Sequence, residues 1–122
     1  MSRNTVSYRV VVDGTSARAE LPPMRLEVTA GSDAGACFAS EAERFTIGTD
    51  ERADMVLHDR TVSRFHAEIA VEGERVTIRD LDSHNGTFVG GVSVLHAHLE
   101  PGCTIRIGAT ELEWALQPWE NE

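Results

Sequence analysis

The stretch "AEIAVEGERVTIRDL", residues 67–81, decides the fold class. Ala67, Ile69 and Val71 share one face of a strand while Glu68 and Glu72 share the other, and Val76 and Ile78 repeat this spacing after "EGE". A period of two places apolar side chains on one face of a strand, and a short turn containing glycine joins two such strands. The stretch therefore predicts a β-hairpin with one buried face.

Short apolar alternations continue on both sides of this hairpin. Upstream, "RLEV" and "RFTIG" are separated by the turn "GSDAG", and a brief "DMVL" follows. Downstream, Gly90-Gly91 predicts a second tight hairpin, and "PGCTIRIG" and "ELEWALQ" supply two more strands. A helix could form only at "CFASEAERF", which is too short to organise a core. The sequence thus predicts an all-β sandwich or barrel.

The length and composition fit one compact domain. The chain has 122 residues, of which 41% are hydrophobic and 25% charged. We expect an N-terminal extension at residues 1–23, a domain at 24–117 and a tail at 118–122. The extension could form one strand through Tyr8, Val10 and Val12, followed by a polar connector. No stretch approaches the ~20 apolar residues of a membrane span, and the start lacks a secretory signal. We therefore expect a cytoplasmic protein that does not bind a membrane.

The charge and the cysteines exclude several kinds of partner. A formal net charge of −9 opposes binding to a polyphosphate backbone, so no direct contact with nucleic acid is expected. Every basic residue is an arginine, most simply because of a GC-rich genome, although each can also form a bidentate fork with phosphate. Cys37 and Cys103 lie far apart without a CxxC spacing, which predicts neither a zinc site nor a disulfide.

Two catalytic interpretations deserve a test. Ser63, His66 and Asp80 contain the residue types of a hydrolase triad, but no nucleophile elbow is present and Ser63 lies only three positions from His66. His96 and His98 would face the same way on a strand and could hold zinc or copper. His84 and Cys103 could join them, yet no third ligand is obvious. We expect no enzyme, no metal and no cofactor.

Binding of a phosphate group explains more of the same residues. The loops "GTDERAD", "HDRTVSR" and "DSHNGT" are polar and short. The Ser63 hydroxyl, the Arg64 guanidinium and loop N–H groups together form a socket for one phosphate dianion. The Asn85 amide can hold the main chain of an extended peptide, while Gly86 gives the turn its φ angle. Taken singly, Ser63, Asn85 and Thr87 could equally well be turn caps.

Taken together, the strands and polar loops from Arg25 to about Leu116 resemble the forkhead-associated (FHA) domain, a phosphothreonine-recognition module. The family's Ser-Arg-x-His-Ala matches residues 63–67, and its Asp-Leu-x-Ser-x-Asn-Gly-Thr matches residues 80–87. The resemblance implies a SMAD/FHA-type β-sandwich of about eleven strands with binding loops at one end. By that similarity Ser63 and Arg64 contact phosphate, and Asn85, with His84 beside it, holds the peptide backbone. The supporting positions implied are Gly48, His66, Gly86 and Thr87, with His66 bracing the loops without touching ligand.

One departure from the family pattern bears on affinity. The family usually has a phosphate-binding arginine after the glycine that Gly48 matches, and this chain has Thr49 there. Losing one charge-assisted hydrogen bond costs about 1.5–3 kcal/mol, or roughly 10- to 150-fold in affinity. Arg52 is the nearest replacement. Selectivity would come from placed hydrogen bonds, because acidic residues are interleaved with the arginines expected around the site. The arginines are Arg44, Arg52, Arg60 and Arg64, and the acidic residues are Asp50, Glu51, Asp54 and Asp59.

The sequence therefore predicts a module that binds a phosphothreonine peptide from a protein modified by a serine/threonine kinase, as a monomer or with weak self-association. Its form resembles the N-terminal sensory part of bacterial sigma-54-dependent transcriptional regulators, which implies a role in signalling and transcription regulation. Because of Thr49, a phosphate-independent interaction or self-association module is the alternative. A metal-assisted enzyme using His96 and His98 is the third.

Overall fold

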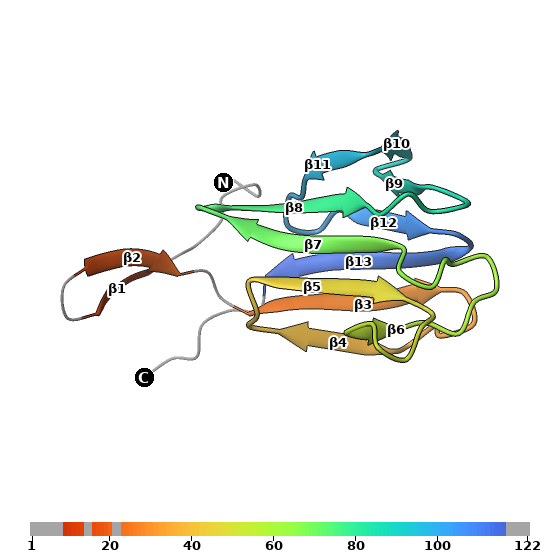
Figure 1. The fold of residues 1–122 in the computed structure, drawn as a ribbon, viewed down its shortest axis with the longest axis horizontal. Coiled ribbons are helices and arrows are strands. Elements are labelled where there is room, and N and C mark those ends of the chain that lie inside the picture. Colours follow the sequence, from red (N-terminus) through yellow and green to blue (C-terminus); the bar gives the residue numbers. More distant parts are fainter. Residues whose placement is uncertain (1–8, 14–15, 21–22, 117–122) are drawn as a thin grey trace.

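The computed structural model describes residues 9–13, 16–20 and 23–116, and it confirms the all-β prediction. Eleven strands form a sandwich of a six-stranded and a five-stranded sheet (Figure 1). The six-stranded sheet has the order β10-β9-β12-β13-β3-β4, with β3 at Met24–Ala30, β4 at Cys37–Ser40, β9 at Thr87–Val89, β10 at Val92–Val94, β12 at Thr104–Ile107 and β13 at Thr110–Leu116. The five-stranded sheet has the order β11-β8-β7-β5-β6, with β5 at Arg44–Gly48, β6 at Met55–Val56, β7 at Ala67–Glu72, β8 at Arg75–Asp80 and β11 at His96–His98.

The N-terminal segment contains two strands where we expected one. Strand β1 (Arg9–Asp13) pairs with β2 (Ser16–Glu20) in an antiparallel hairpin that forms a sheet of its own. The predicted polar connector therefore contributes a strand, which corrects that expectation. Tyr8, which we had included in the first strand, lies outside the described residues.

The apolar alternation of each long strand provides the core between the two sheets. In β3, Met24, Leu26 and Val28 are buried, and Leu112 and Trp114 of β13 are completely inaccessible to solvent. Burying an aliphatic or aromatic side chain of this size contributes about 1.5–3 kcal/mol. The same sheet also buries Ile105 and Ile107 of β12. The facing sheet and the loops between strands contribute most of the other buried apolar residues, among them Phe45, Ile47, Leu57, Ile69, Val76 and Ile78.

Both predicted hairpins are present. Ile69 pairs with Ile78 across β7 and β8, as the opening stretch predicts. Val89 pairs with Val92 across β9 and β10, and Gly90 and Gly91 connect them with φ angles of 58° and 83°. Two successive residues with positive φ match the right-handed twist of the strands, and glycine adopts this conformation at least cost. The segment "CFASEAERF" forms β4 and the start of β5, so the sheet interpretation of it is confirmed.

The strand directions bring three polar loops to one end of the sandwich. Strands β5 and β8 both pair antiparallel with β7, so β5 and β8 end where β7 begins. The loops at residues 49–54, 57–66 and 81–86 consequently lie together, at the right-hand end of Figure 1. Among the described residues, no helix has the length and apolar character needed to cross a membrane.

Candidate functional site

Two of these loops remain joined by backbone hydrogen bonds beyond the ends of their strands. The Thr49 N–H donates to the Ser63 carbonyl oxygen, and the Asp50 N–H donates to that of Arg64, both at 3.1 Å. Gly48 makes this approach possible, since a Cβ atom there would lie 1.9 Å from the Arg64 carbonyl oxygen. No side chain fits such a gap. The pairing places Thr49 beside Ser63 and Asp50 beside Arg64.

The β8–β9 loop is joined by hydrogen bonds to Ser63 and to Thr61. The backbone N–H of His84 donates to Ser63 Oγ at 3.0 Å, and Asn85 Nδ2 donates to the Thr61 carbonyl oxygen at 2.7 Å. The side chains of His84 and Asn85 are exposed, and Ser63 is partly exposed. The structure thus brings these predicted contacts to one place. One amide proton of Asn85 is used within the chain, which leaves its Oδ1 and second proton for a ligand.

His66 lies beneath these loops and is completely buried. Its Nδ1 accepts the Ser63 N–H at 3.0 Å, and its Nε2 lies 2.8 Å from the Gly86 carbonyl oxygen. A carbonyl can only accept, so Nε2 carries the proton and the ring is neutral. Burial lowers the pKa of His66, against the hydrogen bond to Gly86 and the nearby carboxylates, which raise it. His66 therefore joins two loops as a neutral side chain.

Asp80 organises the turn that presents Asn85. Its carboxylate accepts hydrogen bonds from the Ser83 hydroxyl at 2.6 Å, the Ser83 N–H at 3.0 Å and the buried Thr87 hydroxyl at 2.7 Å. Ser83 Oγ in turn accepts the Gly86 N–H at 2.9 Å. Burial opposes ionisation of Asp80, but the hydrogen bonds from Ser83 and Thr87 outweigh it and lower its pKa. Gly86 and Thr87, predicted as supports, are held in this turn.

A second carboxylate, Asp59, organises the loop that carries Ser63. It is buried and accepts hydrogen bonds from the Thr110 hydroxyl at 2.6 Å, the Thr61 hydroxyl at 2.7 Å and the Thr61 N–H at 2.9 Å. The hydrogen bonds from Thr110 and Thr61 lower its pKa. Thr61 Oγ1 also accepts the Ala109 N–H at 2.7 Å, and Gly108 leaves space for it, since a Cβ there would lie 2.5 Å from this oxygen.

Arg64, which is predicted to bind phosphate, is paired with an acidic side chain. Arg64 Nη2 donates to Asp50 Oδ2 at 3.1 Å, and Arg52 forms a fork with the same carboxylate at 2.9 and 3.1 Å. These hydrogen bonds, with those from Arg52 largest, hold the pKa of Asp50 well below its ordinary value. Arg52 also stacks over the Phe65 ring, 5.4 Å from its centroid. Arg52 and Arg64 thus lie together at the site, and both are already paired with the Asp50 carboxylate.

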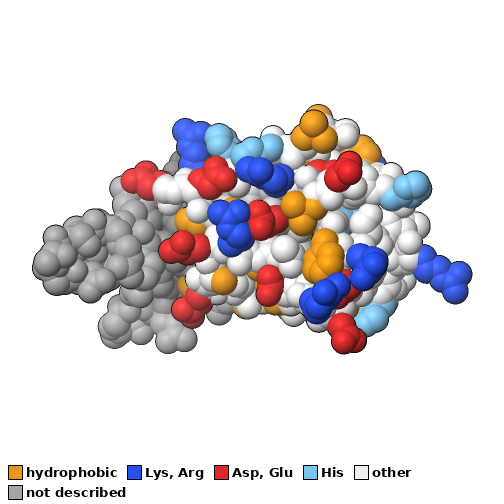
Figure 2. Space-filling view, viewed as in Figure 1, with side chains coloured by type: hydrophobic (Ala, Val, Ile, Leu, Met, Phe, Trp, Pro, Cys, Tyr) orange, Lys and Arg blue, Asp and Glu red, His pale blue; other side chains and the backbone are white. Residues whose placement is uncertain are grey.

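Arg44 does not belong to this group of arginines. It begins β5, at the opposite end from Gly48, and pairs with Glu68 at 2.8 Å. Our expectation that it lies around the site was wrong, because a strand rises about 3.3 Å per residue and separates its two ends. Figure 2 shows acidic and basic groups interleaved over the visible face, without a broad area of one sign. This agrees with recognition by individual hydrogen bonds.

The described contacts do not support the two catalytic interpretations. His66 uses one ring nitrogen for the Ser63 N–H and the other for Gly86, so neither is bonded to the Ser63 hydroxyl, and Asp80 is bonded to Ser83 and Thr87. The exposed His96 and His98 lie on the edge strand β11. Over residues 9–13, 16–20 and 23–116, no three histidine, cysteine or acidic side chains form a group able to hold a metal ion.

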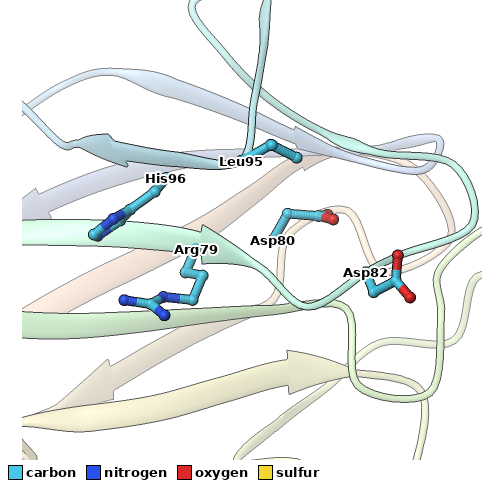
Figure 3. Close-up of a pocket in the computed structure, with 5 residues that line it drawn as sticks. All are labelled: Arg79, Asp80, Asp82, Leu95 and His96. Atoms are coloured by element: carbon cyan, nitrogen blue, oxygen red, sulfur yellow. The ribbon is translucent and has the colours of Figure 1, made fainter.

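An open pocket of about 410 Å³ lies next to the site, between the end of β8 and β11 (Figure 3). It is lined by Arg79, Asp80, Asp82, Leu95 and His96, none of which is a predicted peptide contact. Asp82 belongs to the β8–β9 loop and has a φ angle of 58°. The pocket therefore borders the loop of His84 and Asn85 without including either side chain.

Sequence reasoning missed three residues with central contacts. Asp50 was noted only as one of several acids between arginines, although its spacing of two from Arg52 allows a local ion pair. Asp59 was noted only as another of these acids and Thr61 was not noted, although Asp-x-Thr is a common turn-capping pattern. Their contacts with Ala109 and Thr110 join positions 48 and 51 residues apart. No local pattern indicates a contact over that distance.

Comparisons with known proteins agree with this geometry. Residues 27–118 match the family model described as "Inner membrane component of T3SS, cytoplasmic domain", and by this match the chain belongs to that sequence family. A solved FHA domain studied for phosphothreonine-dependent interactions is 32% identical, with a TM-score of 0.72 over 80% of this chain and 99% of its own. The chain is an FHA domain.

This chain is also similar to two mycobacterial proteins that are named as an FHA domain in a complex and as a regulator. The FHA domain of FhaA, solved in complex with the intracellular domain of Rv3910, is 33% identical, with a TM-score of 0.68 over 75% of this chain and 98% of that one. The glycogen accumulation regulator GarA of Mycobacterium tuberculosis is 35% identical over 104 residues, which are 84% of this chain. The match spans 64% of the length of GarA, so the whole relative is longer than the matched part.

Proposed function

We propose that this FHA domain docks a partner protein through a phosphorylated threonine and has a regulatory rather than an enzymatic role. One observation carries the proposal: Ser63, Arg64 and Asn85 come from two loops that are joined directly by the hydrogen bonds of His84 and Asn85. The hydroxyl and the guanidinium would bind the phosphate, and the Asn85 amide would bind the peptide backbone. The similar domain studied for phosphothreonine-dependent interactions supports threonine as the modified residue.

The wider setting of the domain is also part of the proposal. We infer a bacterial signalling protein of the cytoplasm whose partner is the product of a serine/threonine kinase. The relative named as a regulator of glycogen accumulation supports a regulatory role. Within this class we propose a sigma-54-dependent transcriptional regulator as the protein that carries the module. The net charge of −9 of this chain favours partners with basic residues around the phosphothreonine.

A phosphate-independent interaction module is the second candidate, and the Asp50 carboxylate is the observation that favours it. Asp50 already forms ion pairs with Arg64 and Arg52, and Thr49 supplies no guanidinium. In that case the loops would bind a partner without a phosphate group.

A titration with three peptide libraries separates the two candidates. The libraries carry phosphothreonine, threonine or phosphoserine at a fixed central position, and their affinities are measured for the wild type and Arg64→Ala. We expect binding of the phosphothreonine library alone, weakened roughly 10- to 150-fold by Arg64→Ala. Equal affinity for the phosphorylated and unphosphorylated libraries would instead establish the second candidate.

A further inference from the structure

The Asp50 carboxylate occupies the position next to both arginines of the site. Its Oδ1 accepts hydrogen bonds from the Arg52 N–H at 2.8 Å and Nε at 2.9 Å, and its Oδ2 accepts from Nη2 of Arg52 and of Arg64, each at 3.1 Å. The Asp50 side chain is 10% exposed, whereas those of Arg52 and Arg64 are 70% and 76% exposed. The carboxylate therefore lies on the inner side of the cluster and the guanidinium groups lie toward solvent.

We propose that Asp50 is a specificity-determining residue, an internal carboxylate that competes with ligands for Arg52 and Arg64. The site then accepts a phosphate dianion but rejects a single carboxylate, such as a glutamate in place of the phosphothreonine. This inference rests on the proposed function, because it concerns the same phosphate site. It adds a reason why one class of anion is chosen over another.

The competition follows from the charges of the cluster. Two guanidinium groups and one carboxylate leave a net charge of +1 for a ligand. A ligand carboxylate has only the single charge and two acceptor oxygens that Asp50 already offers, and Asp50 belongs to the same loop as Arg52, so its effective concentration is high. A phosphate carries a charge of about −1.5 to −2 at pH 7 and three acceptor oxygens. It can bind the outer N–H groups of both arginines while Asp50 retains the inner ones.

The backbone prevents Asp50 from simply moving away. Its N–H donates to the Arg64 carbonyl oxygen at 3.1 Å, and the preceding Thr49 N–H donates to that of Ser63. Gly48 is packed against the same carbonyl of Arg64. The main chains of Asp50 and Arg64 are thus held side by side, and the Arg52 backbone N–H holds Asp50 Oδ1 within its own loop at 2.8 Å.

The test compares Asp50→Asn with Glu51→Gln. Asparagine keeps an Oδ1 acceptor for the Arg52 N–H but removes the charge, and Asp50→Ser is a second variant with an acceptor. Glu51 is an exposed neighbour, so Glu51→Gln removes the same charge from the same loop without touching the cluster. Fluorescence anisotropy measures binding of peptide libraries with a central phosphothreonine, glutamate or threonine. Thermal unfolding establishes that each variant is folded.

We expect Asp50→Asn and Asp50→Ser to bind the phosphothreonine library about tenfold more tightly than the wild type and to gain measurable binding of the glutamate library. Glu51→Gln should stay within about twofold of the wild type. Unchanged or weaker phosphothreonine binding by both Asp50 variants would overturn the inference alone, and would show that Asp50 aligns the arginines. If neither the wild type nor any variant distinguishes the phosphothreonine library from the threonine library, the proposed function fails, and the inference fails with it.

Discussion

His66 and Gly86 lie twenty positions apart in the sequence and are joined by a hydrogen bond of 2.8 Å from the imidazole Nε2 to the glycine carbonyl oxygen. The other ring nitrogen accepts the Ser63 N–H. A single buried side chain therefore fixes the distance between the loop that offers the hydroxyl and the loop that offers the amide. Changes that affect the protonation of this ring should affect both loops together.

Stability should decrease when the pH falls below the ordinary histidine pKa of about 6.5. The pKa of His66 is lowered in the folded protein, so the unfolded chain binds a proton first. The stabilisation is complete above the unfolded pKa and is lost as the pH falls through the folded one. Denaturant unfolding between pH 7.5 and pH 5 measures this. His66→Ala should cost about 2–4 kcal/mol, because a fully buried side chain is lost and two partly buried hydrogen bonds to the backbone are lost with it, and should flatten the pH dependence.

The exposed His96 provides the control for this measurement. His96→Ala should keep both the stability and the pH dependence of the wild type. A pH dependence that survives in His66→Ala and disappears in His96→Ala would contradict the assignment to the buried ring.

Gly48→Ala should destabilise the domain by about 2 kcal/mol or more, because the new Cβ would lie 1.9 Å from the Arg64 carbonyl oxygen and force the loops apart. Phosphopeptide affinity should fall with it. The control is Gly35→Ala, at a glycine with positive φ whose Cβ would meet nothing within 4 Å. It should cost about 1 kcal/mol from backbone strain alone and leave binding unchanged. Equal losses of stability in the two variants would refute the close-contact explanation.

Thr49→Arg should raise the affinity for a phosphothreonine peptide about tenfold, by restoring a guanidinium at the position where the family resemblance places one. Thr49→Gln is the matched control, since it adds a long polar side chain without charge and should give little gain. Isothermal titration calorimetry with the phosphorylated and unphosphorylated peptides measures both. A similar gain for the unphosphorylated peptide would show that the new side chain contributes something other than phosphate binding.

Asp59 and Thr110 should show energetic coupling in a double-mutant cycle. Thr110→Val removes a buried hydroxyl that donates to Asp59 at 2.6 Å and should cost about 1.5–3 kcal/mol of unfolding free energy at pH 7. The cost in an Asp59→Asn background should be clearly smaller. Because the pKa of Asp59 is lowered, its contribution should be present above about pH 3.8 and be lost as the pH falls through the folded pKa. Strictly additive costs would show that the two residues act independently.

The sandwich could be predicted from the sequence because its long strands bury one face and expose the other. Leu26 and Val28 in β3 and Leu112 and Trp114 in β13 follow the period of two and are buried. The strand β2 was missed because Ser16–Glu20 offers only alanines between polar residues, a weak apolar signal. Pairing with β1 is a property of two segments together and is not visible in either alone.

The candidate site was predictable where the signal is local. The positions of Ser63, Arg64 and Asn85 followed from motifs, and the structure brings them together through His84 and Thr61. The ion pair of Arg64 with Asp50 was not predictable, because fourteen positions separate them and an acid near an arginine is usually solvated. This ion pair depends on the backbone hydrogen bonds between the loops at 49–54 and 57–66, which only the folded chain forms.

The bond between the His84 N–H and Ser63 Oγ sets the direction in which the serine hydroxyl is polarised. Since the oxygen receives a proton donor from the protein, its own O–H points elsewhere and becomes a stronger donor through hydrogen-bond cooperativity. The hydroxyl hydrogen is thereby directed away from the His84 N–H before any ligand arrives. An anion that accepts this hydrogen leaves the bond between the two loops intact, so donation to a ligand and bracing of the site are shared by one oxygen atom.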